Sequence, residues 1–374
     1  MKIVIDDKIP FIRDVFEPYA EVTYSKGSAI SREMVSDADA LIVRTRTKCN
    51  AALLEGCSVK IIASATIGFD HIDTVWCESH GIKWTNAPGC NSGSVMQYIT
   101  SSLFFLASKH SLRLDSMTLG VVGVGNVGSK VAAAAKAIGM KVLLNDPPRS
   151  RKEGPEGFVT LSEILSECDI VTIHVPYSKE GTDRTHHLVD GRNIYTMKKG
   201  SFLFNSSRGE VVDNAALYEA LAGGHLAGTV LDVWEGEPDA DRRLIARADV
   251  STPHIAGYSV DGKANGTIKA VNEVSAVLGL PLTQWRPSSL PLPSNPFIDL
   301  TAYTELFTSQ ELTGIAVKTT YPIINDITAF KDNPELFESL RDNYWKRREF
   351  SSFTVKCQNT ESTQMLRKLG FNVK

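Results

Sequence analysis

Three charged residues of the sequence carry the combination of groups that oxidises an alcohol beside a dinucleotide. Arg208 lies in Ser-Ser-Arg-Gly-Glu-Val-Val-Asp, Glu237 in Asp-Val-Trp-Glu-Gly-Glu-Pro, and His254 in Thr-Pro-His-Ile-Ala-Gly-Tyr. A guanidinium offers a planar pair of donors that matches a carboxylate, and an imidazole can take a hydroxyl proton near neutral pH. A carboxylate beside the imidazole orients the ring and stabilises its charged form. These residues predict hydride transfer between a nicotinamide and a 2-hydroxy acid.

A glycine-rich turn upstream of these residues is typical of a dinucleotide site. Gly123, Gly125 and Gly128 form the pattern G-x-G-x-x-G between an expected strand and an expected helix. The first glycine permits the tight turn, the second lets the backbone approach a pyrophosphate, and the third lets helix and strand pack closely. Asp146 ends the next expected strand, where a carboxylate binds ribose hydroxyls and repels the additional phosphate of NADP. NAD is therefore the expected cofactor, although two arginines that follow Asp146 weaken the preference over NADP.

Two alternatives stay open for the carboxylate of Asp232. It ends the expected strand Thr229–Leu231 and could meet the nicotinamide end of the cofactor, or it could cap a turn without touching a ligand. Other histidines of the same region are expected to be structural, namely His174, His186 and His187.

The composition is that of a water-soluble globular protein with two or three domains. A chain of 374 residues is longer than one hydrophobic core usually organises. Hydrophobic residues make up 43% of the sequence and charged residues 22%, which are average values for globular proteins. A net charge of −3 leaves no basic excess for a nucleic acid, and no apolar run approaches the roughly 20 residues of a membrane helix. Six dispersed cysteines favour free thiols in a reducing cytoplasm over disulfides or a metal site. The first residues resemble a strand more than a signal peptide, because acidic residues follow at once.

Short apolar runs separated by helical stretches predict two parallel sheets in succession. The first hundred residues contain expected strands at Lys2–Ile5, Ala40–Val43 and Lys60–Ala63, with helices or turns at Ile9–Tyr19, Ser31–Val35 and Ala51–Glu55. A second series of strands is expected at Thr118–Val122, Lys141–Asn145, Ile170–His174, Phe202–Asn205, Thr229–Val233 and Val250–Ser251. Strands joined by helical crossovers predict doubly wound parallel sheets.

Two long helices and a proline-rich stretch set the expected domain boundaries. Ser92–His110 and Val260–Leu278 could carry the chain between domains, and prolines crowd residues 281–296. We expect an α/β fold with two doubly wound parallel-sheet (Rossmann-like) domains, a cleft between them, and a small α+β C-terminal domain. The expected boundaries are 1–92 with 258–285 for substrate binding, 93–257 for NAD binding, and 286–374 for the C-terminal domain.

Together these motifs resemble the D-isomer-specific 2-hydroxyacid dehydrogenases. The match includes the glycine turn, Asp146, Ser206-Ser207-Arg208-Gly209, and the segments around Glu237 and His254. Finer matches, among them Tyr344–Ser352, extend to the C-terminus and resemble a member that acts on a phosphorylated substrate. The resemblance implies NAD-dependent oxidation of 4-phospho-D-erythronate to 3-hydroxy-2-oxo-4-phosphobutanoate, on the route to pyridoxal phosphate. It also implies a homodimer, formed through the C-terminal domain.

The resemblance further implies roles for individual residues. Arg208 and Glu237 are expected to be catalytic, and His254 to be the proton donor and acceptor. The expected cofactor contacts are Gly123, Gly125, Asn126, Val127, Gly128, Asp146, Val175, Ser206, Ser207, Arg208, Asp232 and Gly257. The expected substrate contacts are Thr45, Thr66 and Tyr258. Valine stands at 175, where threonine is also found in the family, so any contact made there by a side-chain hydroxyl is lost.

A phosphorylated substrate also needs cations or backbone donors for its phosphate. Arg44 and Arg46 follow the expected strand Ala40–Val43 at its carboxyl end, and we expect one of them to bind the phosphate. The alternative is the basic run Lys346-Arg347-Arg348, reaching the active site of a neighbouring subunit.

Two other functions stay open. Another D-2-hydroxyacid dehydrogenase, acting on 3-phosphoglycerate or on glyoxylate and hydroxypyruvate, would share the core motifs, but the finer C-terminal matches disfavour it. A corepressor-like protein that senses NAD would use the same fold to bind protein partners. It would need a peptide-binding groove and long unstructured tails, and no such tail is evident in the sequence.

Overall fold

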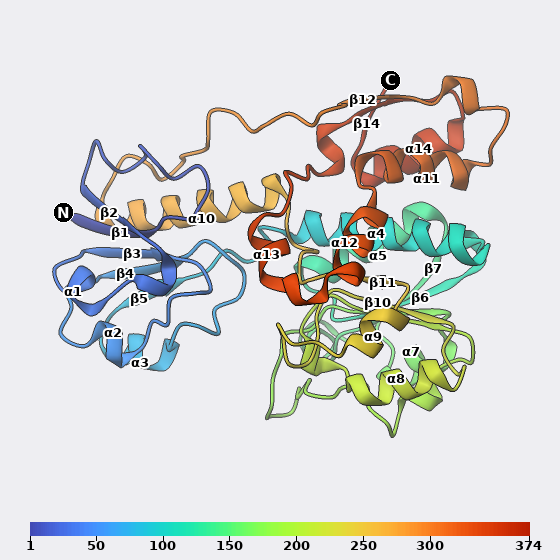
Figure 1. Cartoon of the computed structure of the whole chain (residues 1–374), viewed down its shortest axis with the longest axis horizontal. Coiled ribbons are helices and arrows are strands. Elements are labelled where there is room, and N and C mark those ends of the chain that lie inside the picture. The colour runs from blue at the N-terminus through green and yellow to red at the C-terminus, as the bar shows by residue number, and fades with distance from the viewer. The chain divides into compact units, whose positions relative to one another are not determined.

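The computed structural model describes residues 1–374 and divides the chain into two compact units, each of which is described by itself. One unit comprises Met1–Asn91 with Ser259–Pro291, and the other comprises Ser92–Tyr258 with Leu292–Lys374. Each contains an all-parallel sheet with helical crossovers, which confirms the predicted α/β fold class (Figure 1). The assignment of separate segments to substrate binding, NAD binding and dimerisation stays a prediction.

The first unit is built on a five-stranded sheet in the order β2-β1-β3-β4-β5. Its strands are β1 Lys2–Asp6, β2 Glu21–Ser25, β3 Ala40–Val43, β4 Ile61–Ser64 and β5 Lys83–Thr85. Its helices are α1 Arg32–Val35, α2 Ala51–Leu54, α3 Thr74–Ser79 and α10 Val260–Leu278, with the 3-10 helix η1 at Gly27–Ala29. The strand order reverses between β1 and β3, so a topological switch point lies at the carboxyl ends of these two strands.

The sequence prediction missed both edge strands of this sheet. β2 and β5 contain no fully buried residue, and a half-exposed edge strand leaves no apolar run for a periodicity argument. The stretch Ile9–Tyr19, expected as a helix or turns, consists of turns.

The second unit contains a six-stranded sheet in the order β11-β10-β9-β8-β6-β7. Its strands are β6 Thr118–Val122, β7 Lys141–Asn145, β8 Ile170–Ile173, β9 Phe202–Asn205, β10 Gly228–Leu231 and β11 Val250–Ser251. The crossover helices are α5 Asn126–Ile138, α6 Pro147–Glu153, α7 Leu161–Glu167, α8 Asn214–Ala222 and α9 Arg242–Arg247, preceded by α4 Ser92–His110. The 3-10 helices are η2 Leu114–Ser116, η3 Ile194–Thr196 and η4 Gly209–Val211. Here the switch point lies between β6 and β8.

The C-terminal region of the second unit adds a small parallel sheet and a layer of helices. Its strands are β12 Phe297–Asp299, β13 Thr354–Lys356 and β14 Asn372–Val373, in that order. Its helices are α11 Ser309–Thr320, α12 Ile323–Asp332, α13 Phe337–Asp342 and α14 Thr360–Leu369, with 3-10 helices η5 Thr301–Tyr303, η6 Pro334–Leu336 and η7 Phe350–Ser352. None of the helices combines the length and apolar character that a membrane span requires.

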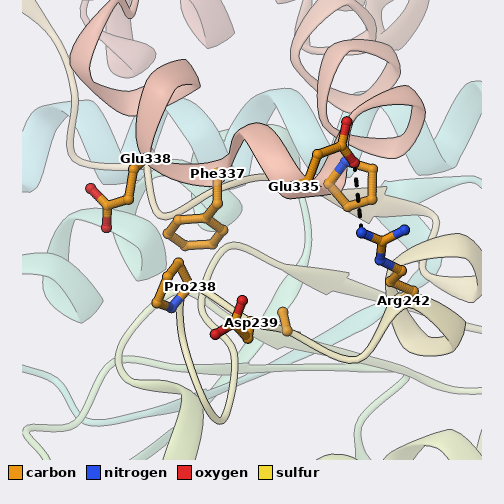
Figure 2. Close-up of a pocket in the computed structure, with 8 residues that line it drawn as sticks. Pro238, Asp239, Arg242, Glu335, Phe337 and Glu338 are labelled. Atoms are coloured by element: carbon orange, nitrogen blue, oxygen red, sulfur yellow. Dashed lines mark ion pairs between the residues drawn. The ribbon is translucent and has the colours of Figure 1, made fainter.

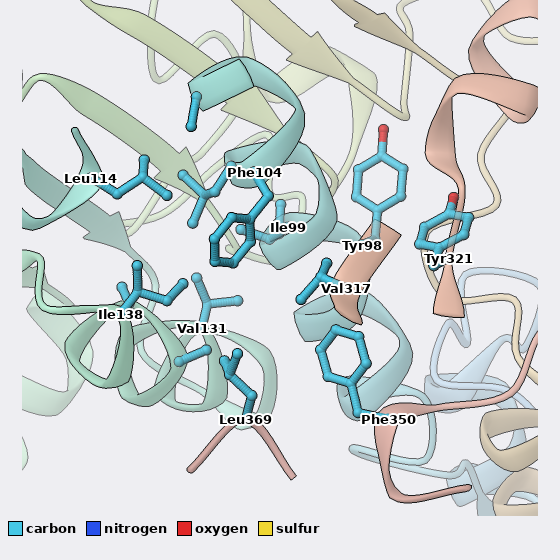
Figure 3. Packing of buried hydrophobic residues seen from close by; sticks show 14 of the residues in the cluster. Tyr98, Ile99, Phe104, Leu114, Val131, Ile138, Val317, Tyr321, Phe350 and Leu369 are labelled. Atoms are coloured by element: carbon cyan, nitrogen blue, oxygen red, sulfur yellow. The ribbon is translucent and has the colours of Figure 1, made fainter. Parts of the chain in front are cut away.

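One hydrophobic cluster joins the C-terminal helices to the large sheet of the second unit. Figure 3 shows Phe104 of α4, Val131 of α5, Val317 of α11 and Leu369 of α14 packed together. Buried apolar side chains of this size contribute about 1.5–3 kcal/mol each relative to their exposed state. The C-terminal helices therefore share one hydrophobic core with this sheet.

Candidate active site

The glycine-rich turn lies at the switch point of the second unit, directly after β6. Gly123 has a φ of +86°, and a Cβ atom at Gly128 would lie 1.9 Å from the carbonyl oxygen of Gly123. No atom lies within 4 Å of a Cβ built at Gly125, and α5 begins at the next residue, Asn126. Because helix N-termini present free N–H donors and partial positive charge, the turn fits a pyrophosphate, as the sequence predicts.

Two further predicted cofactor contacts lie beside this turn. Asp146 accepts hydrogen bonds from the backbone N–H groups of Val124, at 2.8 Å, and of Arg149, at 3.0 Å, so it ties the turn to the start of α6. The Cγ1 atom of Val175 lies 2.9 Å from the position of a Cβ at Gly123, which places this apolar side chain against the turn. The contacts of these residues with NAD remain predictions.

The loop after β9 presents Arg208 at the carboxyl edge of the sheet. Asn205 holds the loop, because its side chain donates to the carbonyl of Arg208 at 2.8 Å and accepts from the backbone N–H of Ser207 at 3.0 Å. The guanidinium of Arg208 donates to the carbonyl of Ser207 at 2.8 Å. The hydroxyl oxygen of Ser206 is buried without a hydrogen-bond partner. A buried polar group of this kind is normally satisfied, so it supports a ligand contact at this edge.

Gly209 brings the Arg208 loop into direct backbone contact with the loop that carries Glu237. A Cβ atom at Gly209 would lie 2.0 Å from the carbonyl carbon of Trp234 and 2.5 Å from the nitrogen of Glu235. Only glycine permits this approach, since both obstacles are backbone atoms that cannot rotate away. The loops that carry Arg208 and Glu237 are therefore positioned by one shared contact.

Gly209→Ala is expected to lower the free energy of unfolding by about 1–3 kcal/mol, because the added methyl group forces the two loops apart. Chemical denaturation of the variant and the wild type measures this change. Gly191→Ala is the matched control, because a Cβ there meets only the Cβ of Ala216 at 3.8 Å, an ordinary contact. Equal stability of the two variants would contradict the proposed contact.

His254 and Glu237 form a hydrogen-bonded pair at the carboxyl edge of the same sheet. The Nδ1 atom of His254 lies 2.8 Å from Oε2 of Glu237, and Oε1 of Glu237 accepts from the backbone N–H of Trp234 at 2.9 Å. An ionised carboxylate can only accept, so Nδ1 carries the proton and Nε2 of the neutral ring is left as the acceptor. The side chain of His254 is 32% exposed, so a substrate can reach it.

The hydrogen bond with His254 changes the pKa of the Glu237 carboxylate. Burial acts to raise the pKa of Glu237, but the hydrogen bond and positive charge of His254 outweigh it and lower the pKa below its ordinary value. Glu237 therefore stays ionised throughout the neutral range and orients the imidazole.

Asp232 holds the turn that carries His254. Its buried carboxylate accepts from the backbone N–H groups of Ile255 and Ala256, both at 2.8 Å, and from the hydroxyl of Thr252 at 2.6 Å. His254 has a φ of +56°, a conformation that persists only where its surroundings enforce it. Burial raises the pKa of Asp232 to about 6, against the opposing charge of His254. The turn-capping alternative is thus present in the structure, while the contact of Asp232 with the nicotinamide stays a prediction.

Gly257 and Tyr258 complete this turn in the second unit. The ring of Tyr258 lies 5.9 Å from the guanidinium carbon of Arg341 and 6.0 Å from the ring of Tyr344. Its proposed role is to contact the substrate.

The remaining predicted substrate residues lie at strand ends of the first unit. Thr45 and Arg46 are exposed in the loop after β3, and Arg44 donates weakly to the carbonyl of Lys8 at 3.5 Å. The hydroxyl of Thr66, after β4, is 2.8 Å from that of Ser64. No ligand contact of these residues is established by the fold.

The basic run at 346–348 does not form the surface cluster that the alternative phosphate site requires. Arg347 is 0% exposed and Arg348 is 8% exposed, so both side chains are buried. Only Lys346 is at the surface. As a joint phosphate site the run was a wrong interpretation, since spacing in the sequence does not show which basic residues are buried.

The other histidines have local partners. Burial lowers the pKa of His174 to about 3, and its Nε2 atom lies 2.9 Å from the hydroxyl of Thr172. The ring of His187 lies 2.6 Å from the carboxylate of Glu235. His187 and Glu235 form a second histidine–glutamate pair, which sequence reasoning missed because the two residues are far apart in the chain.

A pocket of about 280 Å³ adjoins the segment that follows Glu237 but contains none of the predicted site residues (Figure 2). It lies between that segment and η6–α13, and an ion pair of 3.8 Å joins Arg242 to Glu335. Its lining is Pro238, Asp239, Ala240, Arg242, Pro334, Glu335, Phe337 and Glu338. This hollow is therefore not the expected dinucleotide site.

Comparison with protein families and known relatives finds matches for both parts of the second unit. Residues 101–256 match the model of the D-isomer specific 2-hydroxyacid dehydrogenase NAD binding domain, and residues 291–370 match a domain of unknown function. Erythronate-4-phosphate dehydrogenase of Bacteroides thetaiotaomicron is 48% identical over 356 residues, covering 95% of this chain and 99% of the relative. That of Pectobacterium atrosepticum is 41% identical over 375 residues, covering 100% and 98%.

Solved structures agree with these matches. D-lactate dehydrogenase from Aquifex aeolicus, complexed with NAD and lactic acid, is 29% identical, with a TM-score of 0.64 over 76% of this chain and 97% of that one. D-2-hydroxyisocaproate dehydrogenase, 21% identical with a TM-score of 0.62, covers 74% of this chain and 97% of its own and shares the fold. The family model confirms NAD as the predicted cofactor.

Proposed function

Because the chain belongs to the D-isomer specific 2-hydroxyacid dehydrogenases and, among them, to the erythronate-4-phosphate dehydrogenases, we propose that it oxidises 4-phospho-D-erythronate to 3-hydroxy-2-oxo-4-phosphobutanoate. This reaction belongs to the synthesis of pyridoxal phosphate. The observation that carries the proposal is the His254–Glu237 pair, at the same sheet edge as Arg208 and the glycine turn.

Arg208, His254 and Glu237 each have a separate role in the proposed reaction. The guanidinium of Arg208 binds the substrate carboxylate, which fixes the C2 carbon and its hydroxyl. Nε2 of His254 accepts the hydroxyl proton, and Glu237 stabilises the imidazolium that forms. NAD, when bound, supplies the acceptor for the C2 hydride. In the reverse direction His254 returns the proton to the carbonyl oxygen.

A substrate panel tests the proposed function. NADH formation is followed with 4-phosphoerythronate, erythronate and 3-phosphoglycerate, and the reverse reaction is followed with hydroxypyruvate and glyoxylate. We expect kcat/KM for 4-phosphoerythronate to exceed that of every other compound by about 10²-fold or more. Faster turnover of another substrate would assign a different dehydrogenase activity. Tight NAD binding without any turnover would favour the corepressor-like alternative.

We propose Arg46, or its neighbour Arg44, as the cation that binds the substrate phosphate. Arg46→Ala is then expected to lower kcat/KM for 4-phosphoerythronate by about 10–100-fold, the range for a lost charge-assisted hydrogen bond, and to leave turnover of erythronate nearly unchanged. Steady-state kinetics with the two substrates measure the difference. Lys48→Ala, which removes an exposed cation from the same loop, serves as the control. Equal losses for both substrates would remove the phosphate role.

We also propose that the chain forms a homodimer through its C-terminal region. This region exposes the apolar side chains of Phe297, Tyr303 and Leu306, at 50%, 43% and 72%, and burial of such groups favours association. A mass in solution equal to the single 40.9 kDa chain would contradict it.

The proposed location is the cytoplasm. All six cysteines are free thiols, which supports this location.

A further inference from the structure

We propose that Arg347 is a positioning residue that holds the catalytic turn of His254 in place, so that the C-terminal region completes the active site. This inference rests on the proposed function and deepens it. It assigns to the segment matched only by a domain of unknown function a task besides dimerisation.

Arg347 contacts the backbone of the turn that follows His254. Its guanidinium donates to the carbonyl of Ala256 at 2.6 Å and lies 3.5 Å from the carbonyl of Ile255. Its side chain is fully buried, although it is one of the largest in the protein. A buried guanidinium is expensive to desolvate and is retained only where its charge is compensated.

Asp232 and Arg347 hold neighbouring peptide units of this turn and share the unit between Ile255 and Ala256. The N–H groups of Ile255 and Ala256 donate to the carboxylate of Asp232, while their carbonyl groups face Arg347. The N–H of the shared unit donates to the buried carboxylate and its carbonyl lies 3.5 Å from the buried guanidinium, so the two charges flank this one peptide dipole from opposite ends, and each also holds one adjacent peptide unit. This arrangement fixes the backbone directly after His254, whose φ of +56° would otherwise relax.

Tyr321, between α11 and α12, and Tyr344, after α13, hold Arg347 itself. The guanidinium carbon lies 4.3 Å from the ring centre of Tyr321 and 5.8 Å from that of Tyr344, within the range of a cation–π contact. Both tyrosine hydroxyls donate to the carboxylate of Asp326 at 2.7 Å. Figure 3 shows Tyr321 close to Tyr98 of α4, and the hydroxyl of Tyr98 lies 2.8 Å from that of Thr252. Arg347 therefore lies in a rigid frame that reaches both sides of the turn.

The charge of Arg347 is not directed at the substrate in this arrangement. Its action on the reaction goes through the backbone of the His254 turn, so a change at this residue should lower kcat far more than it lowers the affinity for the dinucleotide. A residue that served only global stability would affect both quantities together.

The test compares Arg347→Lys and Arg347→Met with Arg367→Lys in the full chain. Arg367→Lys is the matched control, because it makes the same substitution at an exposed arginine of the same C-terminal region. Four quantities are measured: the melting temperature, the Kd for NADH, the kcat and KM for 4-phosphoerythronate, and hydrogen exchange of peptides that cover residues 250–260.

The expected results depend on how many of the hydrogen bonds between residue 347 and the carbonyls of Ile255 and Ala256 each variant keeps. Arg347→Lys keeps the charge but not the planar guanidinium whose Nη2 atom reaches both carbonyls, and should lose about tenfold in kcat. Arg347→Met should lose about 10²-fold, the range for a catalytic group displaced by about 1 Å. In both variants the Kd for NADH should stay within about threefold of the wild type, and the 250–260 amides should exchange about tenfold faster. Arg367→Lys should match the wild type.

Two results would overturn the inference. One is an Arg347→Lys variant whose turnover and amide exchange equal those of Arg367→Lys; the other is a loss of NADH affinity as large as the loss of kcat. If Arg347→Met does not fold, Arg347→Lys decides alone. If the wild-type chain does not oxidise 4-phosphoerythronate, the proposed function fails, and the amide exchange still decides whether Arg347 holds the turn.

Discussion

Replacing His254 by glutamine is expected to lower kcat by about 10³-fold, within the range for a lost general base, while the Kd for NADH changes less than threefold. The reason is that Nε2 of His254 is the acceptor left free when Nδ1 donates to Glu237 at 2.8 Å. Glutamine keeps a polar side chain of similar length, but its amide cannot accept a proton near neutral pH. Steady-state oxidation of 4-phosphoerythronate and fluorescence titration with NADH measure the two quantities.

The chain provides a matched control for this experiment. His187 also pairs with a glutamate, Glu235, at 2.6 Å, and also has a positive φ, of +49°. His187→Gln should reduce kcat less than about tenfold, because no catalytic task is assigned to this pair. Similar losses in the two variants would mean that His254 is not the base.

Glu237→Gln is expected to have the second largest effect, about 10²–10⁴-fold in kcat, by forcing the wrong tautomer on His254. The backbone N–H of Trp234 needs an acceptor and lies 2.9 Å from Oε1, so the amide oxygen of the new side chain is held at that position. Its NH₂ group then faces Nδ1 of His254, which must become the acceptor. Nε2 consequently carries the proton and can no longer take one from the substrate.

This prediction has its own control and a structural readout. Glu235→Gln removes a charge two residues away, where the carboxylate accepts from the N–H of Asn214 at 2.8 Å, and should cause a much smaller loss. Nitrogen chemical shifts of the His254 ring should report the proton on Nε2 in Glu237→Gln and on Nδ1 in the wild type. An unchanged tautomer with an intact kcat would contradict the assigned role of Glu237.

The sequence predicts the strands and the strand-end residues well, for a physical reason. Buried parallel strands such as β3 and β9 are continuous apolar runs, and catalytic groups gather where such strands end. Arg208, Asp232 and His254 could therefore be assigned to one sheet edge from their positions after three expected strands. The half-exposed β2 and β5 lack that signal.

The sequence could not show the contacts that hold these residues. The approach of Gly209 to Trp234 and the clamp of Arg347 on Ala256 join segments far apart in the chain, and neither leaves a periodic pattern. Arg347 also shows that the burial of a basic residue cannot be predicted from its sequence neighbours. A basic run normally indicates a solvated surface, whereas here tertiary packing buries its two arginines.

The most direct test of the account is the pH dependence of kcat/KM for 4-phosphoerythronate in the wild type and in His254→Gln. Oxidation requires a base at residue 254 that can accept the hydroxyl proton, so kcat/KM of the wild type should fall about tenfold per pH unit on the acidic side. The same acidic limb should be absent from the residual activity of His254→Gln. A wild-type profile without that limb, or a limb that persists unchanged in the variant, would contradict the assignment of His254 as the group that moves the proton.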